Sequence, residues 1–380
     1  MDFTYPPEAE AFRKEFRAWL EGNLDPELAG RPYKLLDGGD EVVAGLRAWN
    51  RKLADARYAA IAWPEEYGGR GASVMEQVVF AEEMSRAGAP GTLNPLGISN
   101  IAPAIMQWGT EEQKRAFLPR MLRGDDIWCQ GFSEPNAGSD LASLRTRAVL
   151  DGDVLVVNGQ KIWNTLGHLA NWCELLVRTD PDVPKHKGIS CLLVDMTLPG
   201  VEVRPLATIT GEREFNEIFL TDVRVPRDAL LGPLHEGWKV AMTTLAHERG
   251  NVANLHLGVR KKVARLLEAA RANGTADDPV IRQRLAQVYL EAEYLKLLAD
   301  RAISAMVHGR EMGPESSIAK LVWGEVENHI AEAAADVLGM EAATGEWGRD
   351  RVYVRAMTIV GGTTQINKNV IAQRILGLPR

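Results

Sequence analysis

The sequence contains few cysteines, no block of basic residues and no long apolar run. Its three cysteines, Cys129, Cys173 and Cys191, lie far apart among 380 residues. This spacing argues against a disulfide framework and indicates buried thiols in a reducing compartment. No apolar stretch approaches the roughly 18 residues that a membrane-spanning helix needs. The first residues, MDFTYPPEAEAFRKEF, include no apolar segment typical of a secretory signal. We therefore expect a cytoplasmic protein without a membrane partner.

Charge and metal-ligand spacing exclude two further classes of protein. The net charge is −7 and the isoelectric point is near 5.7, so nucleic acid is not an expected partner. The pair His247-Glu248 begins like a zinc-binding helix, but Asn251 stands where the second histidine of His-Glu-x-x-His belongs. We expect no metal. The length predicts two or three domains with a sizeable core.

Periodicity divides the chain into a helical, a β-rich and a second helical part. Residues 9–20 place apolar side chains at helical spacing, and Thr110 to Gln113 form a capping-box pattern. Helical spacing returns after residue 236. The expected fold is therefore a multidomain α+β protein. It has a helical N-terminal domain (1–126), a middle antiparallel β domain (127–232) and a C-terminal domain resembling a four-helix bundle (233–380).

Short apolar runs separated by turn residues predict the middle strands. Asn158-Gly159, which follows the first of these runs, is a strong hairpin signal. The predicted strands are Val154–Val157, Leu175–Val177, Ile189–Val194, Val201–Val203 and Phe215–Val225. With no helices between them, they indicate an antiparallel barrel or sandwich.

Two long helical segments are predicted in the last part, at about residues 237–272 and 279–307. Asp278-Pro279 provides a helix start, and Gly309 a helix stop. Two such helices favour an antiparallel bundle.

Two motifs in the middle part contain residues that suit a polar ligand. Ser133 to Asp140 reads SEPNAGSD and Gly159 to Thr165 reads GQKIWNT. Free backbone N–H groups and hydroxyls of such a Gly- and Ser-containing segment can bind phosphate or polar heteroatoms. Taken alone, the first segment also fits a capped turn, and a tryptophan such as Trp163 is more often part of a core than of a ligand site.

These motifs, together with the last 25 residues, resemble the acyl-CoA dehydrogenases. The C-terminal run AMTIVGGTTQINKNVIAQRILGLPR is similar to that family's signature, and WPEEYGGRG (63–71) and WGTEEQK (108–114) are further matches. The resemblance therefore covers nearly the whole chain. It implies an enzyme that binds FAD through Gln130, Phe132, Ser133, Gly138, Ser139, Trp163, Thr165, Thr363 and Gln365.

The catalytic glutamate that many family members carry before Gly-Thr-(Ser/Thr)-Gln-Ile is missing here, because Gly361 occupies that position. Some members instead place the glutamate before an arginine near the start of the first long C-terminal helix. Glu248-Arg249 stands in that position, so we expect Glu248 to be the catalytic base. The resemblance also implies substrate contacts by Ser139, Arg249 and Gly362 and by the backbone N–H of Gly361.

Removal of a weakly acidic α-proton from an acyl-CoA needs a base whose pKa is near neutrality. A glutamate desolvated between a flavin and a bound thioester acquires such a pKa. The resemblance implies that the product is a trans-2-enoyl-CoA and that electrons pass to electron-transfer flavoprotein. It also implies a homo-oligomer, dimer or tetramer, or a heterotetramer with a homologous chain.

Two departures from the family pattern leave other functions open. The Arg-x-x-Phe-Gly motif that reaches a neighbouring subunit's flavin diphosphate is absent from residues 271–279, and Asp336 replaces a common glutamine. One alternative is therefore a non-catalytic subunit that completes a partner's FAD site. The other is an acyl-CoA oxidase, since oxygen access is not encoded in any motif. The pattern resembles a bacterial branch that includes dehydrogenases of steroid side chains.

Overall fold

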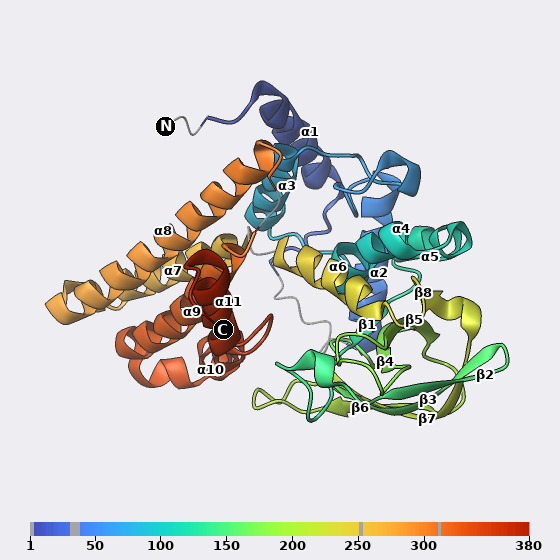
Figure 1. Ribbon diagram of the computed structural model, residues 1–380. Coiled ribbons are helices and arrows are strands. Elements are labelled where there is room, and N and C mark those ends of the chain that lie inside the picture. Colours follow the sequence, from blue (N-terminus) through green and yellow to red (C-terminus); the bar gives the residue numbers. More distant parts are fainter. Residues whose placement is uncertain (1–3, 31–38, 251–253, 311–312, 380) are drawn as a thin grey trace. The chain divides into compact units, whose positions relative to one another are not determined.

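The computed structural model describes residues 4–30, 39–250, 254–310 and 313–379 and divides the chain into two compact units (Figure 1). One unit consists of Met1–Phe16, Val74–Arg86 and Arg249–Arg380, and the other of Arg17–Ser73 and Ala87–Glu248. We refer to them as the bundle unit and the sheet unit. No helix among the described residues is long and apolar enough to cross a membrane.

Along the sequence, one group of helices precedes the strands and a second group follows them, as expected. Before the strands lie α1 (Pro7–Asn23), α2 (Gly39–Asp55), α3 (Val74–Ala87), α4 (Ala102–Trp108) and α5 (Glu111–Arg123). After them lie α6 (Gly237–Gly250), α7 (Leu255–Ala272), α8 (Pro279–Val307), α9 (Ser316–Leu338), α10 (Gly345–Tyr353) and α11 (Thr364–Val370).

The sheet unit is built on one sheet of eight strands in the order β6-β7-β3-β2-β4-β5-β8, with β1 paired to β4. The strands are β1 (Trp128–Gly131), β2 (Arg147–Asp151), β3 (Val154–Ile162), β4 (Trp172–Arg178), β5 (Ile189–Asp195), β6 (Val201–Leu206), β7 (Phe215–Pro226) and β8 (Leu230–Leu231). The α+β prediction with its middle β part is confirmed. Most pairings are antiparallel, but β1 and β2 pair with β4 in parallel. No hairpin joins β1 to β4, so nothing forces those two strands to run antiparallel.

The bundle unit is held together by an apolar core between α7, α8 and α9, with buried residues such as Val259, Val288 and Ile330. The start of α1 and helix α3 are joined by an ionic contact, in which Arg13 Nη1 lies 2.9 Å from Glu82 Oε2 and 3.3 Å from Glu83 Oε1. Each unit therefore has its own core, and the sheet core is a separate cluster.

The helix boundaries follow local sequence signals closely. The Thr110 side chain accepts from Gln113 N and the Gln113 side chain accepts from Thr110 N, which completes the predicted capping box. Helix α8 begins after Asp278, whose carboxylate accepts from Val280 N and Ile281 N. The segment 237–272 contains two described helices, α6 and α7, with residues 251–253 outside the described part of the chain.

The predicted hairpin at Asn158-Gly159 is wrong. Strand β3 runs through both residues and pairs with β7 on either side of a bulge between Val157 and Gly159. The chain turns instead at Gly152, which has a positive φ and lies between β2 and β3. Thr146 atoms lie 2.5–2.8 Å from the place where a Cβ on residue 159 would be. Glycine is therefore needed at position 159 because Thr146 approaches the backbone of β3 closely there, and not because the chain turns.

Helix α6 starts directly against the backbone of β5. A Cβ on Gly237 would lie 2.3 Å from Ser190 C and 2.4 Å from Cys191 N. Replacing Gly237 with Ala should therefore lower the free energy of unfolding by about 1–3 kcal/mol, the usual cost of overpacking. Urea unfolding followed by circular dichroism measures this change.

Gly258 is the matched control, because it lies inside α7 and a Cβ there would meet nothing within 4 Å. Gly258→Ala should leave stability unchanged or raise it by about 0.5–1 kcal/mol through helix propensity. Equal destabilisation by the two substitutions would contradict the close contact of α6 with β5.

Candidate functional site

The residues that the sequence assigns to a site fall into two groups, one in each unit. The sheet unit contains Gln130, Phe132, Ser133, Gly138, Ser139, Trp163, Thr165 and Glu248. The bundle unit contains Arg249, Gly361, Gly362, Thr363 and Gln365. Each group is described within its own unit.

A buried ion pair holds the two ligand-binding motifs of the sheet unit together. Lys161 Nζ lies 2.9 Å from Glu134 Oε1, and the Lys161 and Glu134 side chains are 0% and 9% exposed. Lys161 Nζ also donates to Phe132 O at 3.0 Å. The other bonds of the Glu134 carboxylate come from the backbone N–H groups of Arg145 and Thr146, at 2.7 and 2.8 Å. Although burial acts in the opposite direction, the Lys161 charge and these hydrogen bonds lower the pKa of Glu134.

Backbone and amide hydrogen bonds bring the same two motifs into register. Ile162 N donates to Ser133 O at 3.0 Å, and Asn164 Nδ2 donates to Gln130 O at 2.6 Å. Gln130, Phe132 and Ser133 are thereby brought next to the segment that carries Trp163 and Thr165. The sequence analysis assigns no role to Lys161 or Glu134. The signal for Lys161 is a charged residue inside strand β3, whereas Glu134 lies outside the strands, between β1 and β2.

Trp163 is exposed and its backbone is strained. The indole is 59% exposed, and φ at this residue is 66°, in a region that non-glycine residues rarely adopt. Phe215 contacts the ring edge-on, at a centroid distance of 5.9 Å. A large apolar ring held in solvent by a strained backbone is typical of a ligand platform rather than of a core.

Several buried polar atoms beside these motifs lack hydrogen-bond partners in the described part of the chain. Among them are Gln130 Nε2 and Asn164 Oδ1. Because unpaired buried polar atoms are costly, Asn164 Oδ1 indicates a ligand or water atom that is bound in the working protein. Gln130 Nε2 instead faces the side chain of Glu174 across the β1–β4 pair.

The end of the first motif faces solvent. Gly138 and Ser139 are exposed, and a Cβ on Gly138 would meet nothing within 4 Å. Asp140 is held by Lys185, whose Nζ lies 2.7 Å from Oδ1, and by Ser143 Oγ at 2.5 Å. A ligand can therefore approach the backbone at Gly138 and the hydroxyl of Ser139 without displacing a side chain.

In the bundle unit, the predicted residues form the turn before α11. Gly361 and Gly362 have φ values of 62° and 94°. The Thr363 hydroxyl accepts from Ile366 N at 3.2 Å and so caps α11. Asn367 Nδ2 donates to Gly362 O at 2.8 Å. Gln365 is exposed. The structure thus gives Thr363 a capping role that the sequence had not assigned to it.

Glu248 lies in the last turn of α6 and is half-buried. The side chain of Arg249 lies outside the described residues. One turn before Glu248, Thr244 is fully buried and its hydroxyl donates to Glu174 Oε1 at 2.7 Å. Glu174 was missed from the sequence, where its signal is a single acid inside the apolar strand WCELLVR.

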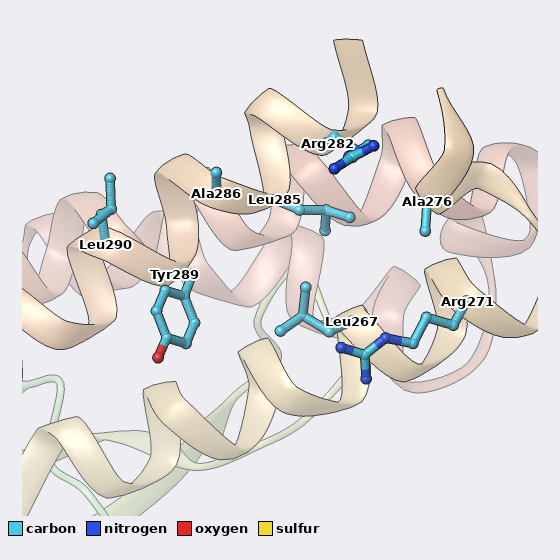
Figure 2. A pocket seen from close by; sticks show the side chains of 8 residues that line it. All are labelled: Leu267, Arg271, Ala276, Arg282, Leu285, Ala286, Tyr289 and Leu290. Carbon is cyan, nitrogen blue, oxygen red and sulfur yellow. The ribbon is translucent and has the colours of Figure 1, made fainter. Parts of the chain in front are cut away.

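A groove of about 530 Å³ opens between α7 and α8 in the bundle unit (Figure 2). Two arginines, Arg271 and Arg282, and the ring of Tyr289 line it, and neither arginine makes an ion pair among the described residues. The remaining lining is apolar, from Leu267, Ala276, Leu285, Ala286 and Leu290. The groove thus lies where the sequence lacks the Arg-x-x-Phe-Gly motif.

Family models match all three parts of the chain. The N-terminal, middle and C-terminal domains of acyl-CoA dehydrogenase match residues 6–125, 129–223 and 235–376. The chain belongs to the acyl-CoA dehydrogenase family. Its members are FAD-dependent oxidoreductases of fatty acid or steroid β-oxidation.

Similar proteins include two acyl-CoA dehydrogenases and a chain of a two-component complex. Acyl-CoA dehydrogenase IpdE1 of Mycobacterium tuberculosis is 42% identical over 98% of each chain. The human mitochondrial short-chain specific acyl-CoA dehydrogenase is 32% identical over 86% of this chain and 82% of its own. A chain of the ChsE4-ChsE5 complex from M. tuberculosis superposes with a TM-score of 0.86 at 34% identity and full coverage of both chains.

The sheet unit fits the flavin that this family uses. Trp163 offers an exposed ring surface, and Asn164 Oδ1 is a buried atom in need of a partner. No cluster of side chains suited to a metal ion occurs among the described residues.

Removing the Lys161 ammonium should unfold the protein readily, because Glu134 would remain buried and unpaired. Lys161→Met should lower the free energy of unfolding by about 3–5 kcal/mol and weaken FAD binding, since both motifs are tied to this ion pair. Urea unfolding and FAD titration of the apoprotein measure the two effects.

Lys185→Met is the matched control, because the Lys185–Asp140 pair is exposed, at 47% and 58%. Its cost should be about 0–1 kcal/mol. Adding Glu134→Gln to Lys161→Met should recover part of the lost stability. If it does not, the unpaired carboxylate is not the cause.

Proposed function

We propose that this chain catalyses the α,β-dehydrogenation of an acyl-CoA thioester to a trans-2-enoyl-CoA, with Glu248 as the acceptor of the α-proton. The supporting observation is that a carboxylate is present at position 248 and absent from position 361. Position 361 is a glycine, whereas Glu248 lies on a helix anchored to the same sheet that carries Gln130 and Trp163.

The residues of the sheet unit bind and orient. Trp163 provides a ring surface for the flavin, and Gln130, Phe132, Ser133, Gly138 and Thr165 supply polar or close backbone contacts along it. Ser139, at the exposed end of its motif, contacts the substrate. Bound FAD supplies the acceptor for the β-hydrogen, which leaves as hydride.

The residues near the thioester control the charge that develops there. Glu248 takes the α-proton onto its carboxylate, and Arg249 orients that carboxylate. The backbone N–H of Gly361 donates to the thioester oxygen, where negative charge accumulates in the transition state. A backbone donor needs no side chain, so glycine at this position keeps that function. Gly362 borders the acyl chain, and Thr363 and Gln365 extend the FAD contacts. The electron acceptor is electron-transfer flavoprotein.

Glu248→Gln tests the base assignment. The purified flavoprotein, mixed anaerobically with short, long, branched and steroidal acyl-CoAs, should lose its visible flavin absorbance with at least one class. Glu248→Gln should slow that bleaching by about 10²–10⁴-fold, the usual contribution of a general base, while leaving FAD content unchanged.

Glu236→Gln is a suitable control, because Glu236 precedes the same helix and its carboxylate pairs with the exposed Lys239, one turn further along the chain. The flavin of Glu236→Gln should be bleached at the wild-type rate. Unchanged bleaching in Glu248→Gln would remove Glu248 from the chemistry.

A second function, as a non-catalytic subunit that completes a partner's FAD site, is supported by the groove between α7 and α8. Its two unpaired arginines suit a diphosphate, and Tyr289 and the leucines suit a flat ring. In this case the chain alone would bind no FAD and would bleach with no thioester. Flavin binding would then appear only on addition of a homologous partner chain, and Arg271→Ala with Arg282→Ala would abolish it.

A further inference from the structure

Glu174 is a fully buried acid for which the proposed chemistry has no use. It lies in the middle of β4 and is 0% exposed. The register of the parallel pair β1–β4 places Gln130 opposite it. Strand β5 and helix α6 provide the other neighbours, Cys191 and Thr244.

The two carboxyl oxygens of Glu174 have different surroundings. Oε1 accepts a hydrogen bond of 2.7 Å from Thr244 Oγ1 and a longer contact of 3.9 Å from Cys191 Sγ. Among the described residues, neither Oε2 nor Nε2 of the facing Gln130 has a hydrogen-bond partner of ordinary geometry, although the Gln130 side chain does act on the Glu174 carboxyl. Rotation of the Gln130 amide by half a turn exchanges its oxygen and nitrogen, whose positions are nearly equivalent. In that orientation the Gln130 oxygen can accept a hydrogen bond from a proton on Glu174 Oε2.

In the described part of the chain, no cation compensates a charge on Glu174. The groups that face it are the neutral side chains of Gln130 and Thr244 and the thiol of Cys191. The thiol of Cys173, the preceding residue of β4, points to the other face of the sheet. Burial raises the pKa of the Cys191 thiol, and a hydrogen bond with Cys129 together with burial raises that of Cys173. A buried carboxylate without a counter-charge is strongly disfavoured. Burial accordingly raises the pKa of Glu174 to about 8, against the lowering effects of the Thr244, Gln130 and Cys191 side chains.

Helix α6 is fixed to the sheet at two points. Gly237 abuts the backbone of Ser190 and Cys191 in β5, and Thr244, seven residues later, bonds to Glu174 in β4. Glu248 follows Thr244 by four residues and therefore lies on the same face of the helix, one turn further. The Thr244–Glu174 bond thus anchors the turn of α6 that directly precedes the proposed base.

We propose that Glu174 is a positioning residue that acts as a neutral carboxylic acid, holding the turn of α6 that precedes Glu248 and orienting the Gln130 amide. This role rests on the proposed function of Glu248. It assigns no contact between Glu174 and the substrate. Ionisation of Glu174 places an unpaired charge between β4 and α6 and so disturbs both groups that it positions.

Four variants separate the neutral acid from other roles, with anaerobic flavin bleaching by a good acyl-CoA as the rate measurement. Thr244→Val and Glu174→Leu, which remove either side of the bond, should slow bleaching by about tenfold or more, as small misplacements of a catalytic group do. Thr244→Ser and Glu174→Gln keep the hydroxyl and the neutral hydrogen-bonding side chain, and both should retain the wild-type rate at pH 7. Substrate binding should change little in all four. Loss of rate in Glu174→Gln at pH 7 would overturn the proposal, because it would show that the anion is required.

The pH dependence supplies a second test. The rate of wild-type bleaching should fall as the pH rises through about 8, whereas Glu174→Gln should not show this fall. Identical profiles in the two proteins would overturn the proposal.

Two readouts do not depend on Glu248 and so separate failure of this proposal from failure of the proposed function. The infrared spectrum at pH 7 should contain the carbonyl stretch of a protonated carboxyl that Glu174→Gln removes. The unfolded carboxyl ionises near its ordinary pKa of 4.5, but the folded one keeps its proton to about 8. Wild-type stability should therefore fall over this pH range relative to Glu174→Gln. Absence of both signals refutes the neutral acid, while their presence with normal bleaching by Glu248→Gln refutes only the base assignment.

Discussion

The arrangement of the sheet unit depends on one buried ion pair. Lys161 and Glu134 come from segments nearly thirty residues apart, and each is removed from water. Their charges cannot be left unpaired at this depth, so the two segments must lie together whenever the unit is folded. The hydrogen bonds from Lys161 to Phe132 O and from Ile162 to Ser133 O follow from that constraint. The stability of the fold and the geometry of the flavin contacts thus depend on the same atoms.

This dependence explains how Trp163 can be held in an unfavourable conformation. Two residues before it, Lys161 is buried and fixed, and one residue after it, the Asn164 backbone N–H donates to Asn216 O. With both flanks determined, the left-handed backbone at Trp163 and the exposure of its indole are imposed by the surroundings. The ring surface is present before any ligand arrives, so little ordering is required on binding.

Much of the fold was predictable because its signals are local. The capping box at Thr110 and the Asp278-Pro279 helix start depend on neighbours in the sequence, and the structure contains both. The hairpin prediction at Asn158-Gly159 failed because the requirement for glycine came from Thr146, the residue that precedes β2, which no local pattern reveals. Glu174 was missed for the same reason. Its environment is made by β1, β5 and α6, and only the fold brings them together.

The candidate site was predicted mostly through family resemblance. The structure brings together only some of the predicted residues. Hydrogen bonds bring the Gln130 and Trp163 segments together, and buried polar atoms without partners lie there among the described residues. The three-domain division remains a prediction, as do the roles of Glu248 and Gly361, because the two compact units each contain only one group of the site residues.

The backbone at Gly361 restricts how the sequence can change. With φ at 62°, any side chain placed there adopts a left-handed conformation that costs roughly 1–2 kcal/mol. A glutamate introduced at 361 would meet this cost before it contributed any chemistry, while Glu248 would still be present. Transfer of the base between the two positions therefore requires coordinated changes in the turn as well as in the carboxylates.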